Sequence, residues 1–510
     1  MSTSASLPAS GPWAVPKNVR WVLLGIMLAM LLSMLDNMVV STVMPVIVAD
    51  LGALEHISWV VTAYTLVTAI TTPIWGKFGD LFGRKPMYLA SIASFIVGSA
   101  LCGAAQSMTG LIAFRVVQGI GAGGIGAGAF VLIGALVPPR ERGKCQGLTA
   151  SVVAVGTIGG PLLGGFVTGH FDWRWAFYVN LPVGLLALVW VWRMLHVPAQ
   201  RIKARIDWVG IGLLTGSITA IVLASTWAGT TYAWGSWQML GLGVLAVIGL
   251  AAFIAVEKRV AEPLLPLSVF TNHRNYPLAM VLILVAGAVI FGAGLCLPLF
   301  QQSVQGASAT NSVLLMLPMM ILIVIVSTIA GKVMSATGRY KIFPVLGILF
   351  LATGLGLLVT MSTHTSQPLT SLYMALVGIG LGFTLQMSGI IAQNSVSPRD
   401  MGAAMGFVNL FRTLGDSLGV AVFGSLFTRA VEPALAAATA PGAPHHLPGG
   451  VEDAYLQAVT TGTGHVFLTA ATQCALAFFA ALFVIEVPLT EAVPAAHPAG
   501  KAENISAAAT

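Results

Sequence analysis

The chain has 510 residues, of which 57% are hydrophobic and only 8% are charged. A soluble globular protein carries roughly 25% charged residues, so the composition excludes a soluble domain and predicts an integral membrane protein. The net charge of +7 does not indicate a nucleic-acid partner, because the basic residues lie in short segments between apolar runs. The four cysteines lack metal-ligand spacing, so neither a metal site nor a disulfide framework is indicated.

Apolar runs of about 20 residues each predict fourteen transmembrane helices in an all-α polytopic protein. Their approximate ranges are 21–44, 57–75, 86–105, 109–136, 147–169, 176–195, 208–228, 237–256, 276–300, 312–331, 343–361, 369–391, 403–428 and 464–486. With the N-terminus inside, twenty of the 24 Lys and Arg residues fall in cytoplasmic segments or at the cytoplasmic end of a span. We therefore expect a multi-pass protein of the cytoplasmic membrane with both termini in the cytoplasm.

The two halves of the chain repeat one another. The segment 76–85 recurs as 331–341, and Pro139-Arg-Glu-Arg-Gly143 recurs as Pro398-Arg-Asp-Met-Gly402. Such parallel repeats are typical of facilitator-type transporters, whose two bundles enclose a central cavity near the midplane of the bilayer. The expected domains are a tail (1–20), an N-terminal six-helix bundle (21–196), a linker with two inserted helices (197–260), a C-terminal six-helix bundle (275–486) with an external loop (429–463), and a tail (487–510).

Five motifs follow one another in the first half. They are Leu35-Asp-Asn-Met-Val-Val-Ser-Thr-Val-Met-Pro45, the segment Gly76–Lys85, Arg115-Val-Val-Gln-Gly119, a row of Gly147, Gly156, Gly160, Pro161, Gly164 and Gly165, and Trp173-Arg-Trp-Ala-Phe-Tyr-Val-Asn-Leu-Pro182. The row lies in the fifth predicted span. Gly and Pro are tolerated in lipid, where small residues let neighbouring backbones approach closely. The row therefore predicts a helix that packs tightly and bends.

In this order, the motifs resemble those of the 14-helix drug:proton antiporter family of the major facilitator superfamily, over about residues 20 to 486. The row in the fifth span is similar to the antiporter motif of that family. The resemblance implies the major facilitator fold, with two six-helix bundles plus two inserted helices. It also implies a proton-coupled multidrug efflux antiporter that exports amphipathic drugs or antibiotics, cations among them, and so confers antibiotic resistance.

The expected partners are therefore small amphipathic molecules, protons and the lipid bilayer, with the chain acting as a monomer. The proton gradient supplies the energy, so no cofactor is expected, and no nucleophile–base pair or metal cluster indicates an enzyme. One alternative is an exporter dedicated to a single endogenous metabolite. An alternative of another class is a non-transporting membrane sensor or scaffold, whose function would not depend on Asp36.

Ionisable residues inside spans are functional candidates by default, because their burial in lipid is costly. Asp36 lies mid-way along the first span and Arg115 lies in the fourth. An acid balanced between burial and a neighbouring Arg can load and release protons. We expect Asp36 to carry the proton and Arg115 to tune it, the pairing that the resemblance also implies. The alternative is a permanent ion pair that only locks the helices together.

Asp416 and Arg412 are i, i+4 neighbours on one helix face of the thirteenth span. The related family usually carries a small residue at the position of Asp416. Because exchange of one proton for a monovalent cation moves no net charge, cation export favours a second proton-carrying acid. Two interpretations of Asp416 therefore remain open: a role in proton coupling or substrate recognition, and a self-neutralising pair with Arg412.

The segment between the second and third spans matches a motif of the family, and the resemblance implies a conformational latch made of Gly76, Asp80, Gly83, Arg84 and Lys85. The resemblance implies that Asp80 accepts hydrogen bonds from across the interface between the bundles in the outward-open state. In the second-half copy Ser335 replaces the acid, so the latch is expected to be one-sided.

The substrate cavity is the last predicted site. Flexible methionines and aromatic faces suit a promiscuous cation site. The candidates for its lining are Met34, Met38, Trp59, Tyr64, Gln386 and Arg412.

Overall fold

The computed structural model describes residues 17–52, 57–196, 206–228, 231–260, 263–265, 267–397, 400–438 and 449–486. Within these ranges the chain is helical, without a named β-strand. The first half contains α1 (Lys17–Leu51), α2 (Ile57–Phe82), α3 (Arg84–Gly103), α4 (Met108–Leu136), α5 (Arg142–His170), α6 (Trp175–Tyr178) and α7 (Asn180–Met194). The inserted pair is α8 (Trp208–Trp227) and α9 (Trp237–Glu257), and a short α10 (Ser268–Asn272) follows. The second half contains α11 (Asn275–Ser303), α12 (Ala309–Thr337), α13 (Ile342–Val359), α14 (Gln367–Asn394), α15 (Met401–Ala438) and α16 (Gly449–Leu482).

The prediction of an all-α membrane fold is confirmed. In the described ranges, 13 helices are long and apolar enough to cross a membrane, with α6 and α7 counted as one broken passage. The 26-residue α2 fills the remaining place in the up-and-down order. Each of the fourteen predicted spans therefore corresponds to a passage of the chain.

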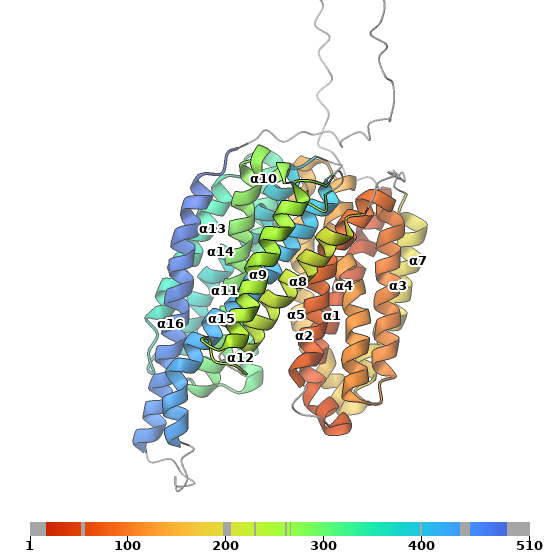
Figure 1. Ribbon diagram of the computed structural model, residues 1–510. Helices are drawn as coiled ribbons and strands as arrows, with labels where there is room; N and C mark the ends of the chain where they lie inside the picture. Colours follow the sequence, from red (N-terminus) through yellow and green to blue (C-terminus); the bar gives the residue numbers. More distant parts are fainter. Residues whose placement is uncertain are drawn as a thin grey trace, which may run out of the picture.

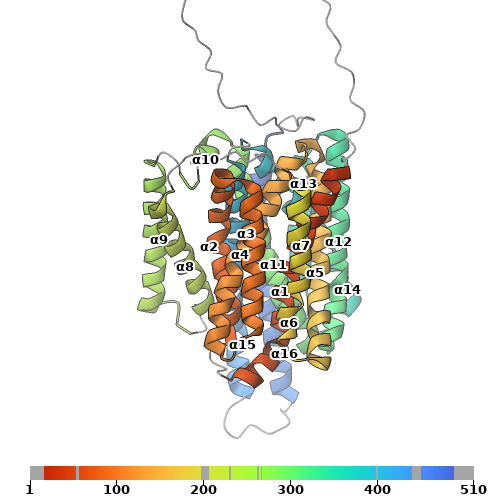
Figure 2. The same ribbon diagram turned by 90° about the vertical axis from the view of Figure 1, so that its right-hand side faces the viewer.

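The helices form two bundles, with the inserted pair beside them. In Figure 1 the first half lies on the right and the second half on the left, and Figure 2 shows α8 and α9 at one edge of the molecule. Because the passages alternate in direction, α1 begins and α16 ends at the same face, here called the terminal face. The face at the other ends of the helices is called the opposite face.

Each bundle has its own apolar core. The core of the first half includes Ile26, Phe95 and Leu132, and that of the second half includes Phe300 and Phe467. A third cluster joins α8 and α9 to α2 and α15 through residues that include Leu66, Leu214, Phe253 and Phe407. The inserted pair thus packs against one helix from each half and covers the seam between them.

The last two helices extend further than the sequence indicates. We predicted an external loop over 429–463, but α15 continues to Ala438 and α16 begins at Gly449. The end of α15 is rich in Ala, the strongest helix former, so the helix continues beyond the roughly 20 residues that a bilayer needs. Residues 439–448, the tails 1–16 and 487–510 and linker residues 197–205 lie outside the described residues.

Candidate functional site

A buried carboxylate lies at the centre of the first bundle. Asp36 on α1 is 1% exposed, and Arg115 on α4 is fully buried. The Nη1 atom of Arg115 donates to Oδ2 of Asp36 over 2.6 Å. The two residues that the sequence predicts as a pair are therefore in direct contact in the structure.

Two amide side chains complete this site. Nε2 of Gln118 on α4 donates to Oδ1 of Asp36 over 2.8 Å, and Nδ2 of Asn180 on α7 donates to the same oxygen over 2.7 Å. Our sequence reasoning did not assign these two residues, although both lie inside motifs that it singled out. Gln118 comes three residues after Arg115 and so shares its helix face, which was the available signal. We call Asp36, Arg115, Gln118 and Asn180 the carboxylate network.

Further contacts fix the orientation of Arg115. Its Nη1 also donates to Oε1 of Gln118 over 2.8 Å, and its Nε donates to the carbonyl of Val60 over 3.3 Å. The guanidinium lies 3.9 Å from the centre of the Tyr64 ring, a cation–π arrangement. Tyr64 is buried, so the structure places this cavity candidate beneath Arg115. Nη2 of Arg115 is buried without a hydrogen-bond partner among the described residues.

The glycine row on α5 packs against the same helix that carries Asp36. A Cβ atom at Gly156 would lie 2.8 Å from Cβ of Met34, and one at Gly164 would lie 2.8 Å from Cβ of Thr42. Between them, a Cβ at Gly160 would overlap Met38. The spacing of four residues on both helices lets α5 approach α1 closely on either side of Asp36.

The other members of the row have different surroundings. A Cβ at Gly147 would lie 2.9 Å from Oγ1 of Thr328 on α12, so this glycine faces the other half. Gly165 has no described atom within 4 Å of such a Cβ. Pro161 lies inside α5 and removes one backbone hydrogen bond of that helix.

The predicted latch lies between the halves at the terminal face. Oδ2 of Asp80, near the end of α2, accepts from the backbone N–H of Ala403 over 3.1 Å, at the start of α15. Arg84 lies 3.5 Å from the other carboxylate oxygen. An anion at a helix N-terminus interacts favourably with the helix dipole.

The pKa of Asp80 is affected by this position, which lies beyond the predicted membrane span 57–75. Burial raises the pKa of Asp80 to about 7, while Arg84 and the α15 amides act in the opposite direction.

A glycine contact lies beside this carboxylate, and a related one recurs at a second junction between the halves. A Cβ at Gly76 would overlap the carbonyl of Gly402. At the equivalent place, a Cβ at Gly143 on α5 would lie 2.7 Å from the carbonyl oxygen of Gly331 on α12. The internal repeat relates Gly76 to Gly331 and Gly402 to Gly143. The terminal face is therefore closed by two backbone contacts of related geometry.

The second of these contacts has its own charged residue, which our sequence reasoning missed. Arg142 is 2% exposed, and its Nη1 donates to Oδ1 of Asn394 on α14 over 2.6 Å. Its Nη2 donates to the carbonyl of Gly134 over 2.6 Å, near the end of α4. Carbonyl ends of helices favour cations. The repeated Pro139–Gly143 motif was the signal that could have identified Arg142.

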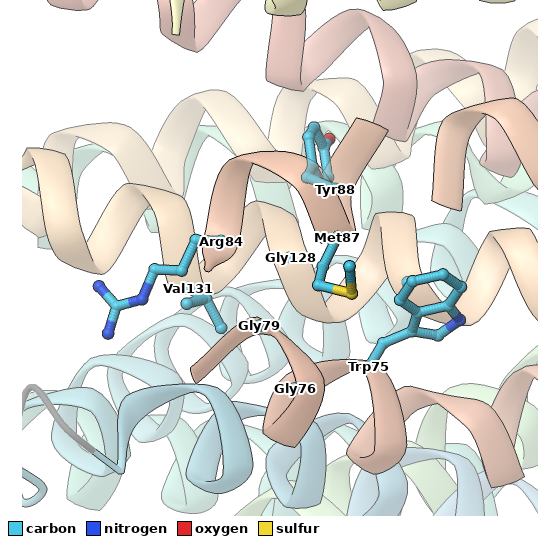
Figure 3. A pocket seen from close by; sticks show the side chains of 9 residues that line it. Trp75, Gly76, Gly79, Arg84, Met87, Tyr88, Gly128 and Val131 are labelled. Carbon is cyan, nitrogen blue, oxygen red and sulfur yellow. The ribbon is translucent and has the colours of Figure 1, made fainter. Parts of the chain in front are cut away.

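The remaining latch residues shape the turn between α2 and α3. Gly83 has a φ of 102°, a conformation that favours glycine, and Lys85 donates to the carbonyl of Trp192 over 2.8 Å. A cavity of about 20 Å³ lies beside this turn, between α2, α3 and α4. Figure 3 shows Arg84 extending away from Trp75, which lies at the other end of the cavity.

The other candidates for the substrate cavity lie on several helices of both halves. Met34, Met38, Gln386 and Arg412 are partly buried. Trp59 at the start of α2 meets Trp227 of α8 edge to face, with ring centres 6.1 Å apart.

The second predicted acid lies in the other bundle. Asp416 and Arg412 lie on α15, and neither forms an ion pair within 4.0 Å to a described residue. A Cβ at Gly287 on α11 would lie 3.2 Å from Oδ1 of Asp416. The two side chains therefore form no direct ion pair in this conformation, although the charge of Arg412 acts on the Asp416 carboxyl group.

The sequence model described as Major Facilitator Superfamily matches residues 26–420. The chain belongs to the major facilitator superfamily. An uncharacterized MFS-type transporter of Mycobacterium tuberculosis strain H37Rv is 37% identical over 497 residues, which are 95% of this chain and 72% of the relative. The multidrug transporter protein MdtP of Bacillus subtilis strain 168 is 36% identical over 388 residues, 76% of this chain and 71% of MdtP.

Solved structures agree with the superfamily fold. The human organic anion transporter MFSD10 superimposes with a TM-score of 0.61 at 15% identity, covering 90% of this chain and 100% of that one. The family model and the relatives make this superfamily member a transporter, and its apolar helices make it a multi-pass membrane protein. Its carboxylate network lies in the first bundle and its Asp80 contact lies between the bundles.

Proposed function

We propose that this superfamily member is a proton-coupled efflux antiporter that exports amphipathic compounds, cations among them, from the cytoplasm by alternating access. Two relatives from Bacillus subtilis, named multidrug transporter protein MdtP and multidrug resistance protein 3, support an efflux role. The observation that carries proton coupling is the buried Asp36, whose carboxylate accepts hydrogen bonds from three side chains. In this proposal the proton gradient supplies the energy.

The hydrogen bonds of the carboxylate network match one protonation state. Arg115 and the two amide NH₂ groups donate, and an ionised carboxylate only accepts. A protonated Asp36 needs an acceptor for its O–H, but Oε1 of Gln118 already accepts from Arg115 and from the Cys102 thiol, which occupy both of its lone pairs. Protonation therefore either leaves the O–H unpaired or breaks a contact among α1, α4 and α7. Leaving a buried polar group unpaired costs about 1–3 kcal/mol, enough to shift an equilibrium between two conformations.

The contacts between the bundles supply the second conformational element. If the terminal face is cytoplasmic, the Asp80 and Arg142 contacts close the cytoplasmic end, as in an outward-facing state. Opening this face requires Asp80 to leave the α15 N-terminus and Arg142 to leave Asn394. Charge-assisted bonds of this kind are stronger than neutral ones, but they depend on short distances, so a small shift of one bundle breaks them.

Asp416 supports the export of cations. Its carboxylate has no ion pair within 4.0 Å among the described residues, and it lies in the second bundle, away from the carboxylate network. We assign it the second proton or the positive charge of a substrate. Exchange of a monovalent cation for two protons moves net charge and so gains about 2.3 kcal/mol per 100 mV.

The test is transport by the purified full chain in liposomes with an imposed pH gradient and a fluorescent amphipathic cation. Wild type should accumulate the dye uphill, and Asp36→Asn should lower the accumulation at least tenfold. Asp172→Asn, in an exposed loop of the opposite face, is the matched control and should behave as wild type. Equal accumulation by Asp36→Asn and wild type would refute proton coupling through Asp36. Transport of one metabolite alone would indicate a dedicated exporter, and no transport would indicate a sensor or scaffold.

A further inference from the structure

A second, larger cavity lies on the flank of the molecule. Its volume is about 630 Å³, and its walls come from α8, α9, two residues of the segment between them (Ala228 and Trp234) and two residues of α15 (Leu418 and Ala421). Known small-molecule sites span roughly 300–1,000 Å³. The cavity belongs to neither bundle core and none of the predicted site residues line it.

The walls of this flank cavity are almost entirely apolar. They include Ala224, Met239 and Gly243, and no charged side chain is among the lining residues. The hydroxyl of Ser225 already donates to the carbonyl of Val222 over 2.7 Å. The other polar side-chain group in the lining is the indole N–H of Trp234, a residue that is 41% exposed. A cation would find no counter-charge here, whereas a hydrocarbon chain would bury apolar surface at little desolvation cost.

The lipid bilayer around the cavity contains such hydrocarbon chains. Both α8 and α9 are candidate membrane spans, and only 17% of the apolar window of α9 is buried. Figure 2 shows the pair at the edge of the molecule. Trp234 precedes α9 at the opposite face, and Trp is enriched where membrane and water meet.

We propose that the flank cavity binds one acyl chain of a membrane phospholipid, with the polar end of the lipid near Trp234. At the opposite face, α8 stays on the first bundle through the Trp59–Trp227 contact. Phe253 of α9 stacks on Phe407 of α15, nearer the terminal face, with ring centres 6.4 Å apart. The acyl chain therefore fills the space in which the inserted pair separates from α15.

Two glycines of α9 provide a matched pair of variants. Neither Gly241 nor Gly243 has a described atom within 4 Å of a built Cβ, so both accept a side chain. Gly243 lines the cavity and Gly241 does not. Gly243→Leu therefore adds a side chain at the cavity wall and narrows the cavity, and Gly241→Leu adds the same bulk outside it.

The experiment is native mass spectrometry of the full chain, extracted in mild detergent from nanodiscs of phosphatidylethanolamine and phosphatidylglycerol. Wild type and Gly241→Leu should retain one phospholipid per chain, and Gly243→Leu should lower that fraction at least fivefold. Leu240→Trp, a second change in the cavity wall at a position that is 62% exposed, should have the same effect.

Equal lipid retention by all four proteins would overturn the proposal. Displacement of the retained lipid by a fluorescent amphipathic cation, one for one, would also overturn it and assign the cavity to substrate. Because the readout is bound lipid and not efflux, the result does not depend on the proposed transport cycle.

Discussion

Gly76 on α2 and Gly402 on α15 touch backbone to backbone, so that a Cβ on either residue would overlap the carbonyl oxygen of the other. Asp80, one helical turn beyond Gly76, accepts from the backbone N–H of Ala403 directly after this contact. The two bundles can therefore bring a carboxylate to the start of α15 only because neither glycine has a side chain.

Gly76→Ala should hold the terminal face open. The added methyl group cannot coexist with the Gly402 carbonyl, so the closed conformation loses stability, and we expect efflux to fall about tenfold. Gly79→Ala on the same helix is the control, because its Cβ has no described atom within 4 Å. Spin–spin distances between labels on α2 and α15 would measure the change, and equal distances in both variants would contradict this explanation.

The packing of α5 on α1 should be equally sensitive to size. Gly160→Ala places a methyl group against Met38, and overpacking of this kind costs about 1–3 kcal/mol. We expect a lower melting temperature and weaker coupled transport for Gly160→Ala, while Gly165→Ala should resemble wild type. A loss that is the same for both glycines would show that the spacing of the row has no special role.

Asn180→Ala should impair the carboxylate network without removing a charge. The substitution removes one of the two donors to Oδ1 of Asp36 and leaves Gln118 as the other, and a hydrogen bond to a charged group contributes about 1.5–3 kcal/mol. We expect pH-driven dye accumulation to fall at least fivefold. Asn180→Gln, which keeps the amide, should recover part of it, and an unchanged rate in Asn180→Ala would remove Asn180 from the site.

The latch should weaken as the pH rises from about 4 to 7. The pKa of Asp80 is about 7 in the closed contact, against 3.8 for an ordinary Asp. The closed state therefore binds more protons than an open state with a solvated carboxylate, and rising pH favours opening across this window. Above pH 7 the effect is constant. Labels across the terminal face would detect this dependence, and Asp80→Asn should abolish it; persistence in the variant would exclude Asp80 as the source.

Asp416→Asn should separate the two classes of substrate. Efflux of neutral compounds should be spared, while efflux of monovalent cations should fall about tenfold, because the variant loses either the second proton or the counter-charge. Dose–response assays with matched neutral and cationic dyes would measure this, and equal losses for both classes would exclude a charge-specific role.

The sequence predicts the membrane passages and the Asp36–Arg115 contact because apolar length and rare buried charges are strong signals. It does not single out Gln118 and Asn180, since amides occur in spans for many reasons and their convergence depends on how α4 and α7 pack around α1. The spacing of Arg412 and Asp416 allows either a self-neutralising pair or a functional acid, and the structure shows no N···O contact within 4.0 Å between their charged groups. Ion pairs between i and i+4 residues are weak, so the local geometry of the helix does not determine the side-chain contact.

The most direct test of proton exchange at Asp36 uses purified protein in weakly buffered detergent solution. Addition of a fluorescent cation substrate to wild type should release protons, because substrate and proton occupy the transporter alternately. Asp36→Asn should still bind the dye and release fewer protons per chain than wild type, by the share that Asp36 carries. If the variant binds the dye and releases as many protons as wild type, then Asp36 does not carry the exchanged proton.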